Sequence, residues 1–542
     1  MRSILRREYG ALRIPLLALV VVLLLGGGAV AYFLLSPPED EPPPAEPGVR
    51  AIVAQPVDIL GWDPHDHGCT MTEAVLVNVF DYLVWRTPGG QLEPSLALEW
   101  EKLDDVTWEF RLRPDVYWHD GEPFGADDVV FSLERLAALG TEGVTARYPY
   151  FRRIESVTAV DELSVHIRTV HPDSTLPSRL SRTGAAILPH HYFNETDVAA
   201  EMESLSREDF WQSPVGTGPF RIVAHIPDDR IRLQSFPEHW RGPAAVRDLT
   251  FLVVPDPSQR AHLLLEGEVD VATHIGSSDW VSLESSEGVR LVRRIGSQAV
   301  VLTLSMEEHH PTHRTEIREA IDLALDNQSL VDDVFAGAAT STRTRVIPGA
   351  MGSHPDLYNS YRFDPERARQ LIVEHTSEEQ RQVGLLYSED AHPAFPDLAE
   401  AMAEMLENVG LRVVVDAKPH SEYFSILGTN SAPALSLSVE DGCAADCSVS
   451  FEHLVNDDLY RHPGGFECPE FEEIFLRASA SGDRNTRVRE YRLLAEMVAE
   501  ARPEIPLFHL LSNHGVGRGI DWSPRPDELL WMWPAVRTPT FE

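Results

Sequence analysis

The loop at residues 61–70 carries three side chains that can bind a metal ion, namely His65, His67 and Cys69. They stand at alternate positions, so an extended backbone would project all three to one side. Two imidazoles and a thiolate suit a borderline-soft cation such as nickel, zinc or copper. The alternative is a polar loop with Cys69 buried or disulfide-bonded. We favour this alternative and assign no metal, because spacing alone rarely specifies a site.

A second group of reactive side chains comes late in the chain, where Cys443, Cys447 and Cys468 follow one another closely. In an oxidising compartment these cysteines are candidates for a disulfide that shapes the local loop, although the pairing cannot be read from sequence. A metal site formed by Cys443, Cys447 and a histidine is the alternative. Further upstream, Arg343 and Arg345 are candidates for a bidentate grip on a carboxylate, or else solvated surface arginines.

None of these groups forms a catalytic motif. We find no Gly-x-Ser-x-Gly elbow, no His-Glu-x-x-His helix, no phosphate-binding glycine loop and no dinucleotide fingerprint. The formal net charge of −39 also repels phosphate backbones, which argues against nucleic acid as a partner. The sequence therefore predicts a protein without catalytic activity, without a cofactor and without a nucleic-acid partner.

The N-terminus predicts where the protein is located. Residues 1–14 are basic, and residues 15–35 form an uncharged, mostly aliphatic run. At about 1.5 Å per residue, such a run is long enough to span a hydrocarbon core of roughly 30 Å. Arginines before it and acids after it place the bulk of the chain outside the cytoplasm. The run is either an uncleaved transmembrane anchor or a signal peptide cut after residues 29–31. A proline-rich linker follows at residues 36–50.

The elements that would position the candidate residues alternate between strands and helices. Residues 108–112 and 163–167 alternate apolar and polar side chains, as half-buried strands do, and residues 300–304 are typical of a buried strand. Apolar positions at helical spacing mark helices within residues 317–335, 398–409 and 488–498. This pattern predicts an α/β chain, and its length predicts more than one domain.

Six segments, in this order, resemble the extracytoplasmic solute-binding proteins of family 5, which serve ABC importers for oligopeptides, dipeptides and nickel. The most specific is residues 91–136, with a Pro-x-Leu-Ala opening, a strand, a His-Asp-Gly turn and an Ala-Asp-Asp-Val helix start. The other segments include a Gly-Thr-Gly-Pro turn and an Asp-Pro-Glu helix start, and they are residues 214–220, 265–272, 318–339, 361–372 and 495–508. Together they cover the chain from about residue 52 to residue 540.

The resemblance implies a two-lobed α/β fold of the type II periplasmic binding protein class, in the large cluster with an extra domain. Lobe I would combine residues 51–90, 213–305 and 506–542. The extra domain would be residues 91–212, and lobe II residues 306–505. The ligand would lie in a cleft between lobes that close by a hinge motion.

The resemblance also implies ligand contacts. In the family the loop after the first strand faces the cleft, which makes candidates of Trp62, Asp63, His65 and Cys69. In peptide-binding members an aspartate pairs with the ligand's amino terminus, within a stretch that resembles Ala-Asp-Tyr-x-Asp-Pro. Residues 439–454 correspond to it here, with Asp441 and Asp446 as candidates. The Tyr and the Asp-Pro of that stretch are missing here, so this sequence departs from the peptide-binding pattern.

The expected function is therefore capture of a small solute, a peptide foremost, and its delivery to the permease subunits of an ABC importer. The protein would act as a monomer at the extracytoplasmic face of the cytoplasmic membrane, in the periplasm where there is one. It would be held there by its N-terminal helix unless that helix is cleaved. The alternatives are a membrane-tethered sensory or assembly protein that reuses the fold, and a receptor for a metal such as nickel.

Overall fold

The computed structural model describes residues 50–65, 69–141, 151–182, 184–193, 208–389, 391–427, 429, 432–441, 446–456, 462 and 464–538. Within these residues no helix is both long and apolar enough to cross a bilayer. The predicted anchor at residues 15–35 lies outside them, and so do His67 and Cys443.

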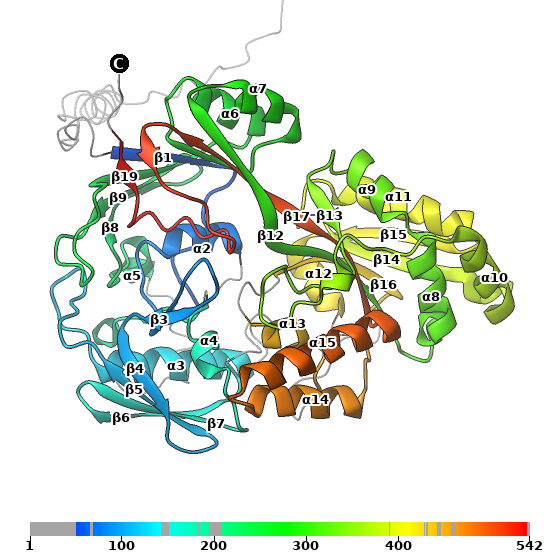
Figure 1. Ribbon diagram of the computed structural model, residues 1–542, viewed down its shortest axis with the longest axis horizontal. Helices are drawn as coiled ribbons and strands as arrows, with labels where there is room; N and C mark the ends of the chain where they lie inside the picture. The colour runs from blue at the N-terminus through cyan, green and yellow to red at the C-terminus, as the bar shows by residue number, and fades with distance from the viewer. Residues whose placement is uncertain are drawn as a thin grey trace, which may run out of the picture. The chain divides into compact units, whose positions relative to one another are not determined.

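The largest feature of the described chain is an eleven-stranded mixed sheet. Its strands in spatial order are β15 (Arg412–Lys418), β14 (Gln382–Ser388), β16 (Leu435–Asp441), β12 (Val289–Leu304), β17 (Glu504–Gly517), β11 (Val271–Thr273), β1 (Arg50–Gln55), β10 (Asp248–Val253), β9 (Arg230–Ser235) and β8 (Phe220–Ile226). An eleventh strand, β13 (Ala339–Ser341), pairs with β17 off this path. Figure 1 shows the long strands β12 and β17 running from one group of strands to the other.

The pairing of β12 with β17 divides this sheet in two. The register shifts between the pairs that contain Ile295 and Ala299, which marks a bulge at residues 296–298. On one side, residues 289–295 and 511–517 join β1 and β8–β11, which we call half-sheet A. On the other side, residues 299–304 and 504–510 join β13–β16, which we call half-sheet B. The sequence predicted only residues 300–304 of β12, because arginines interrupt the apolar pattern of its first half.

A separate four-stranded sheet, which we call the outer sheet, contains β4 (Ala97–Lys102), β5 (Thr107–Leu112), β7 (Ser164–Thr169) and β6 (Ile154–Asp161), in that order. The strands predicted at residues 108–112 and 163–167 are confirmed as β5 and β7. Two short pairs complete the strands, β2 (Val84–Arg86) with β3 (Leu92–Pro94), and β18 (Ile520–Asp521) with β19 (Val536–Arg537).

Helices fill the connections between strands. They are α2 (Thr70–Leu76), α3 (Ala126–Thr141), α4 (Leu176–Arg179), α5 (Glu208–Gln212), α6 (Pro257–Leu265), α7 (Trp280–Ser285), α8 (Thr315–Ala324), α9 (Asn327–Asp333), α10 (Pro365–His375), α11 (Phe395–Asn408), α12 (His420–Leu427), α13 (Ser448–Glu452), α14 (Pro469–Ala480) and α15 (Arg484–Ala501). Sequence signals fix several starts. The Asp364 side chain accepts from the Arg367 N–H, and Pro365 follows it with no N–H to satisfy, so α10 begins there.

The buried apolar side chains form separate cores. One core joins half-sheet A to the outer sheet, with members such as Phe251 and Phe110. A second core lies between half-sheet B and the helices α8, α10 and α11. A third packs α13, α14 and α15 together around Phe471 and Tyr491. The outer sheet therefore belongs with half-sheet A, whereas α13–α15 have a core of their own.

Candidate functional site

The strand register shows where the carboxyl ends of the parallel strands of both half-sheets come close together. Strands β1 and β11 are parallel, and β11 runs antiparallel to β17 from Val271 opposite Val516 to Thr273 opposite His514, toward the bulge. In half-sheet B, β16 runs along β12 and ends with Asp441 opposite Gln298, inside the bulge. Ligands of open α/β sheets bind beyond the carboxyl ends of parallel strands. Both sets of ends converge on residues 296–298, so the candidate site lies there.

The half-sheet A side of this site holds a small hollow at the ends of β1 and β11. Its lining residues are Gln55, Pro56, Thr70, Met71, Ala74, Thr273, His274, Glu528 and Leu530. It offers about 10 Å³ to the centre of a water-sized sphere, which is the room that one water needs. In this arrangement of the chain, a solute of peptide size has no room in that hollow.

A second hollow, of about 330 Å³, lies over β14, β15 and α12. Its charged side chains already pair with one another, because Lys418 lies 3.4 Å from both Asp416 and Glu422. These side chains are partly or mostly exposed, where such pairs contribute little to binding or stability. We therefore place the candidate site at the converging strand ends.

The half-sheet B side of the site is charged, and we call its members the Arg345 cluster (Arg345, Glu440, His453, His462 and Glu504). The buried Arg345 guanidinium lies 3.2 Å from the Glu440 carboxylate and 3.3 Å from the Glu504 carboxylate. His453 Nε2 lies 2.9 Å from Glu504. The Glu440 side chain is 39% exposed, so part of its carboxylate is open to a ligand.

Burial and charge set the protonation of this cluster. Burial would raise the pKa of Glu504, but Arg345 and His453 outweigh it and lower that pKa to about 2. Burial, with His453 nearby, lowers the pKa of His462 to about 3. Glu504 is therefore charged and His462 neutral near pH 7. Two carboxylates, those of Glu440 and Glu504, therefore face the one Arg345 guanidinium, and Asp441 follows Glu440 at the end of β16.

The loop after β1 holds its predicted residues in internal contacts. Trp62 is buried, and its indole N–H donates to His225 Nδ1 at 3.2 Å. Asp63 forms a two-pronged ion pair with Arg135, at 3.0 and 2.5 Å. Burial would raise the pKa of Asp63, but Arg135 and then His65 hold it below its ordinary value. These contacts fix the loop against neighbouring elements and leave Trp62 no exposed face.

The two described residues of the metal alternative, His65 and Cys69, have different surroundings. The His65 ring is fully buried, with Nε2 2.8 Å from the Ala186 carbonyl oxygen. Cys69 is a half-buried thiol at the N-cap of α2, next to Thr70 of the small hollow. His67 lies outside the described residues. Of the four loop candidates, Cys69 lies nearest to the hollow in the chain.

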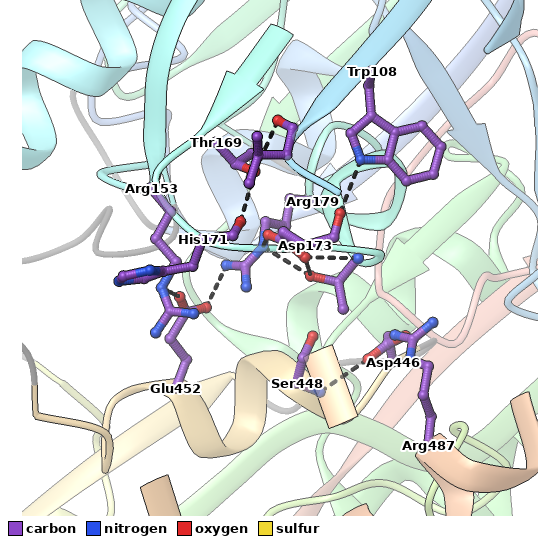
Figure 2. A network of polar contacts seen from close by, with 12 residues as sticks. Trp108, Arg153, Thr169, His171, Asp173, Arg179, Asp446, Ser448, Glu452 and Arg487 are labelled. Carbon is purple, nitrogen blue, oxygen red and sulfur yellow. Dashed lines mark hydrogen bonds and ion pairs between the residues drawn. The ribbon is translucent and has the colours of Figure 1, made fainter. Parts of the chain in front are cut away.

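The other predicted residues divide between the Arg345 cluster and structural roles. Arg343 is half-buried and donates to the Ala499 carbonyl oxygen at 3.3 Å. Asp441 ends β16, directly after Glu440 of the cluster. Asp446 is buried, forms an ion pair with Arg487, and accepts from the Ser448 N–H at 3.0 Å. Figure 2 shows Asp446 turned toward Arg487 of α15. The Asp446 carboxylate is therefore already neutralised inside the protein.

The late cysteines lie in the third core. Cys447 is fully buried there, and Cys468 is half-buried at the N-cap of α14. Cys443 lies outside the described residues, so the predicted disulfide stays a prediction.

Within the described residues, potential metal-binding atoms meet in one group of three, Asp128, His190 and His191. A carboxylate already partners each imidazole, since His190 Nδ1 lies 2.6 Å from Asp128 and His191 Nε2 lies 3.0 Å from Asp120. Asp128 also accepts from the N–H groups of Gly125 and His190, which fixes the start of α3. This network holds the outer sheet's helix in place and needs no ion to satisfy its polar atoms.

Sequence reasoning missed Glu440, His453, His462 and Glu504. Each is an isolated polar residue in its local pattern, and the strand pairing and the loops bring them to Arg345. One signal was available, since Glu504 begins a strand whose next residues, 505–508, are all apolar. A lone carboxylate entering a buried strand needs a charged partner.

Comparisons with known proteins agree with this geometry. Residues 91–436 match the model of the middle region of bacterial extracellular solute-binding proteins, family 5. The dipeptide-binding protein of Escherichia coli is 26% identical over 463 residues, which cover 81% of this chain and 85% of that protein. AgaA of A. tumefaciens, solved with agropinic acid, gives a TM-score of 0.77 at 20% identity and covers 91% of this chain and 99% of that one. NikA of Staphylococcus aureus, solved with a nickel–histidine complex, gives 0.71 at 17% identity, covering 91% and 100%. The chain therefore belongs to family 5 of the bacterial extracellular solute-binding proteins.

Proposed function

We propose that this member of a non-enzymatic family captures a small peptide between its half-sheets, which act as lobes I and II, and delivers it to an ABC importer. The observation that carries the proposal is the convergence of parallel strand ends from both half-sheets on one bulge in β12. In an α/β protein such convergence supports a single site between the loops of two lobes, with a hinge at its base.

The charge at the end of β16 supports a ligand with a cationic group. Glu440 and Glu504 both contact one guanidinium, that of Arg345, and Glu440 keeps part of its carboxylate exposed. Asp441 adds a further acidic residue where β16 ends. A peptide's terminal ammonium would form charge-assisted hydrogen bonds with such carboxylates. The peptide named for the Escherichia coli relative has the same group, and this agreement supports a peptide over an anionic solute.

The test is calorimetric titration of the purified full-length chain with the dipeptide Met-Leu and with its N-acetylated form. Loss of one charge-assisted hydrogen bond costs about 1.5–3 kcal/mol, so acetylation should weaken binding about tenfold or more. Asp441→Asn and Glu440→Gln should weaken Met-Leu binding by a similar factor. Asp446→Asn is the matched control, because its carboxylate pairs with Arg487 and should leave affinity within about twofold.

A second arm of the titration uses nickel with L-histidine, because NikA has a similar fold and was solved with that complex. Binding of nickel–histidine without binding of Met-Leu would replace the peptide by a metal chelate as the solute. If neither binds, the tethered sensory or assembly role that reuses this fold becomes the better account.

A further inference from the structure

Half-sheets A and B, joined through β12 and β17, also meet through the helices α4, α13 and α14 (Figure 1). Helix α4 and the end of β7 share a core with half-sheet A and the outer sheet. Helices α13–α15 form their own core, and α15 leads directly into β17 at Glu504. The contacts between α4 and α13 therefore join two bodies that are otherwise packed separately.

Buried charges form this second junction. Glu452, the last residue of α13, is fully buried and pairs with Arg179 of α4. The second Glu452 oxygen lies 3.1 Å from Arg153 Nε, and the Arg153 guanidinium lies over the Phe475 ring of α14. Figure 2 shows both arginines turned toward Glu452 across the junction. We call Arg153, Arg179, Asp173 and Glu452 the closure cluster.

The arginine side of this cluster has contacts of its own that do not involve α13. Arg179 Nε lies 2.9 Å from Asp173, whose carboxylate also accepts from the N–H and hydroxyl of Thr175. The indole of Trp108 donates to the Asp173 carbonyl oxygen at 2.9 Å. Burial would lower the pKa of Arg179, but Asp173 and Glu452 outweigh it and raise that pKa, so the arginine stays charged.

Two hydrogen bonds donated by Ser174 to backbone carbonyls cross the same junction. The Ser174 N–H donates to the Ser479 carbonyl oxygen at 2.7 Å, and the Ser174 hydroxyl donates to the Ala480 carbonyl oxygen at 2.8 Å. Both acceptors lie at the end of α14, where the last carbonyls of a helix have no partner within the helix.

The chemistry of the junction suits a contact that forms and breaks. Separating two apolar cores would expose hydrophobic surface, whereas charged and hydrogen-bonding groups regain water when they part. A buried carboxylate without its cationic partners is strongly unfavourable, so Glu452 is tolerated here only while both arginines face it. The cluster therefore stabilises the arrangement of the two bodies in which Glu452 contacts both arginines.

We propose that Glu452 is a positioning residue for solute capture: its ion pairs with Arg153 and Arg179 form when half-sheets A and B close over the site and separate when they open. The statement that a solute triggers this closure rests on the proposed function. The contact itself does not, since the residues that make it are independent of the ligand.

The test is hydrogen–deuterium exchange of the full-length chain without solute, read at the Ser174 amide, which donates across the junction. Glu452→Gln leaves two arginines facing one carboxylate, and exchange at Ser174 should become about tenfold faster while the β14 amides stay unchanged. Glu452→Gln combined with Arg153→Gln restores neutrality and should slow exchange again. Asp322→Asn is the control, because it breaks another buried pair, with Arg502 at 2.8 Å, inside one body.

Unchanged exchange at Ser174 in Glu452→Gln would overturn the proposal. Equal acceleration in Asp322→Asn would also overturn it, because the effect would then be general destabilisation. The solute role is tested separately. If Met-Leu fails to bind while Glu452→Gln still frees the Ser174 amide, the proposed function fails and the closure cluster stands.

Discussion

The two half-sheets are joined in two ways that differ in their chemistry. At the bulge the connection is covalent, and ladder hydrogen bonds of β12 and β17 continue on both sides of it. At the closure cluster the connection consists of ion pairs and hydrogen bonds between elements far apart in sequence. If the halves change their angle as we propose, the first junction persists, whereas the ion pairs and hydrogen bonds of the second separate. A receptor that opens and closes requires both a connection that persists, the hinge, and contacts that break on opening.

The largest effect on the free energy of unfolding is expected from acid, through buried titratable groups on β17 and beside it. Burial lowers the pKa of His514 on β17 to about 3 and that of His274 beside it to about 4. Unfolded histidine takes up its proton below about pH 6.5, so these sites favour folding above that pH and lose this contribution as the pH falls. Glu504 acts in the same direction, between its ordinary pKa of 4.5 and about 2.

The free energy of unfolding, measured with urea from pH 8 to pH 4, should therefore be highest at or above about pH 6.5 and fall steadily below it. His514→Asn should flatten that slope. A slope that steepens in His514→Asn would contradict the direction assigned here.

Breaking a buried pair inside one body should cost the next largest amount. Asp322 and Arg502 cannot regain water by a hinge motion, so Asp322→Asn should lower the free energy of unfolding by roughly 3–5 kcal/mol. Glu452→Gln should cost less than half as much in the same urea titration, because its partners regain water when the halves open. Equal losses in the two variants would remove the distinction between the junctions.

The packing at the bulge can be tested by adding a side chain at Gly296. An added Cβ would lie 2.3 Å from the Glu528 carboxylate and 3.0 Å from the Leu510 carbonyl oxygen. Gly296→Ala should therefore lower the free energy of unfolding by about 1–3 kcal/mol, as overpacking does elsewhere. Adding Glu528→Ala removes the nearer clash and should recover part of that loss in thermal unfolding. No recovery would assign the strain to the backbone of β17.

The smallest effect is expected at a surface pair of the outer sheet. Arg168 and Glu155 lie 2.7 Å apart with each side chain about half exposed. Arg168→Gln should change the free energy of unfolding by less than about 1 kcal/mol and leave Ser174 exchange unaltered. A larger change would mean that surface charge, rather than burial, controls the outer sheet.

The sequence predicted the fold further than the site. Ordered motifs identified the family, and the helix start at Asp364 and the strands β5 and β7 follow from local patterns of caps and alternation. The site depends on pairings that local patterns do not contain, since Arg179 and Glu452 are 273 residues apart. Trp62 and His65 were correctly assigned to the loop after β1, but residue type alone does not say which side of a loop is buried.

The most direct test of solute capture is native mass spectrometry of the full-length chain, followed by denaturation and analysis of what is released. We expect one small organic molecule per chain, a peptide with a free amino terminus, or uptake of one Met-Leu by the empty protein. It also predicts that Asp441→Asn reduces this occupancy and that Asp446→Asn does not. A chain that neither releases nor takes up such a molecule would contradict capture of a peptide at the converging strand ends.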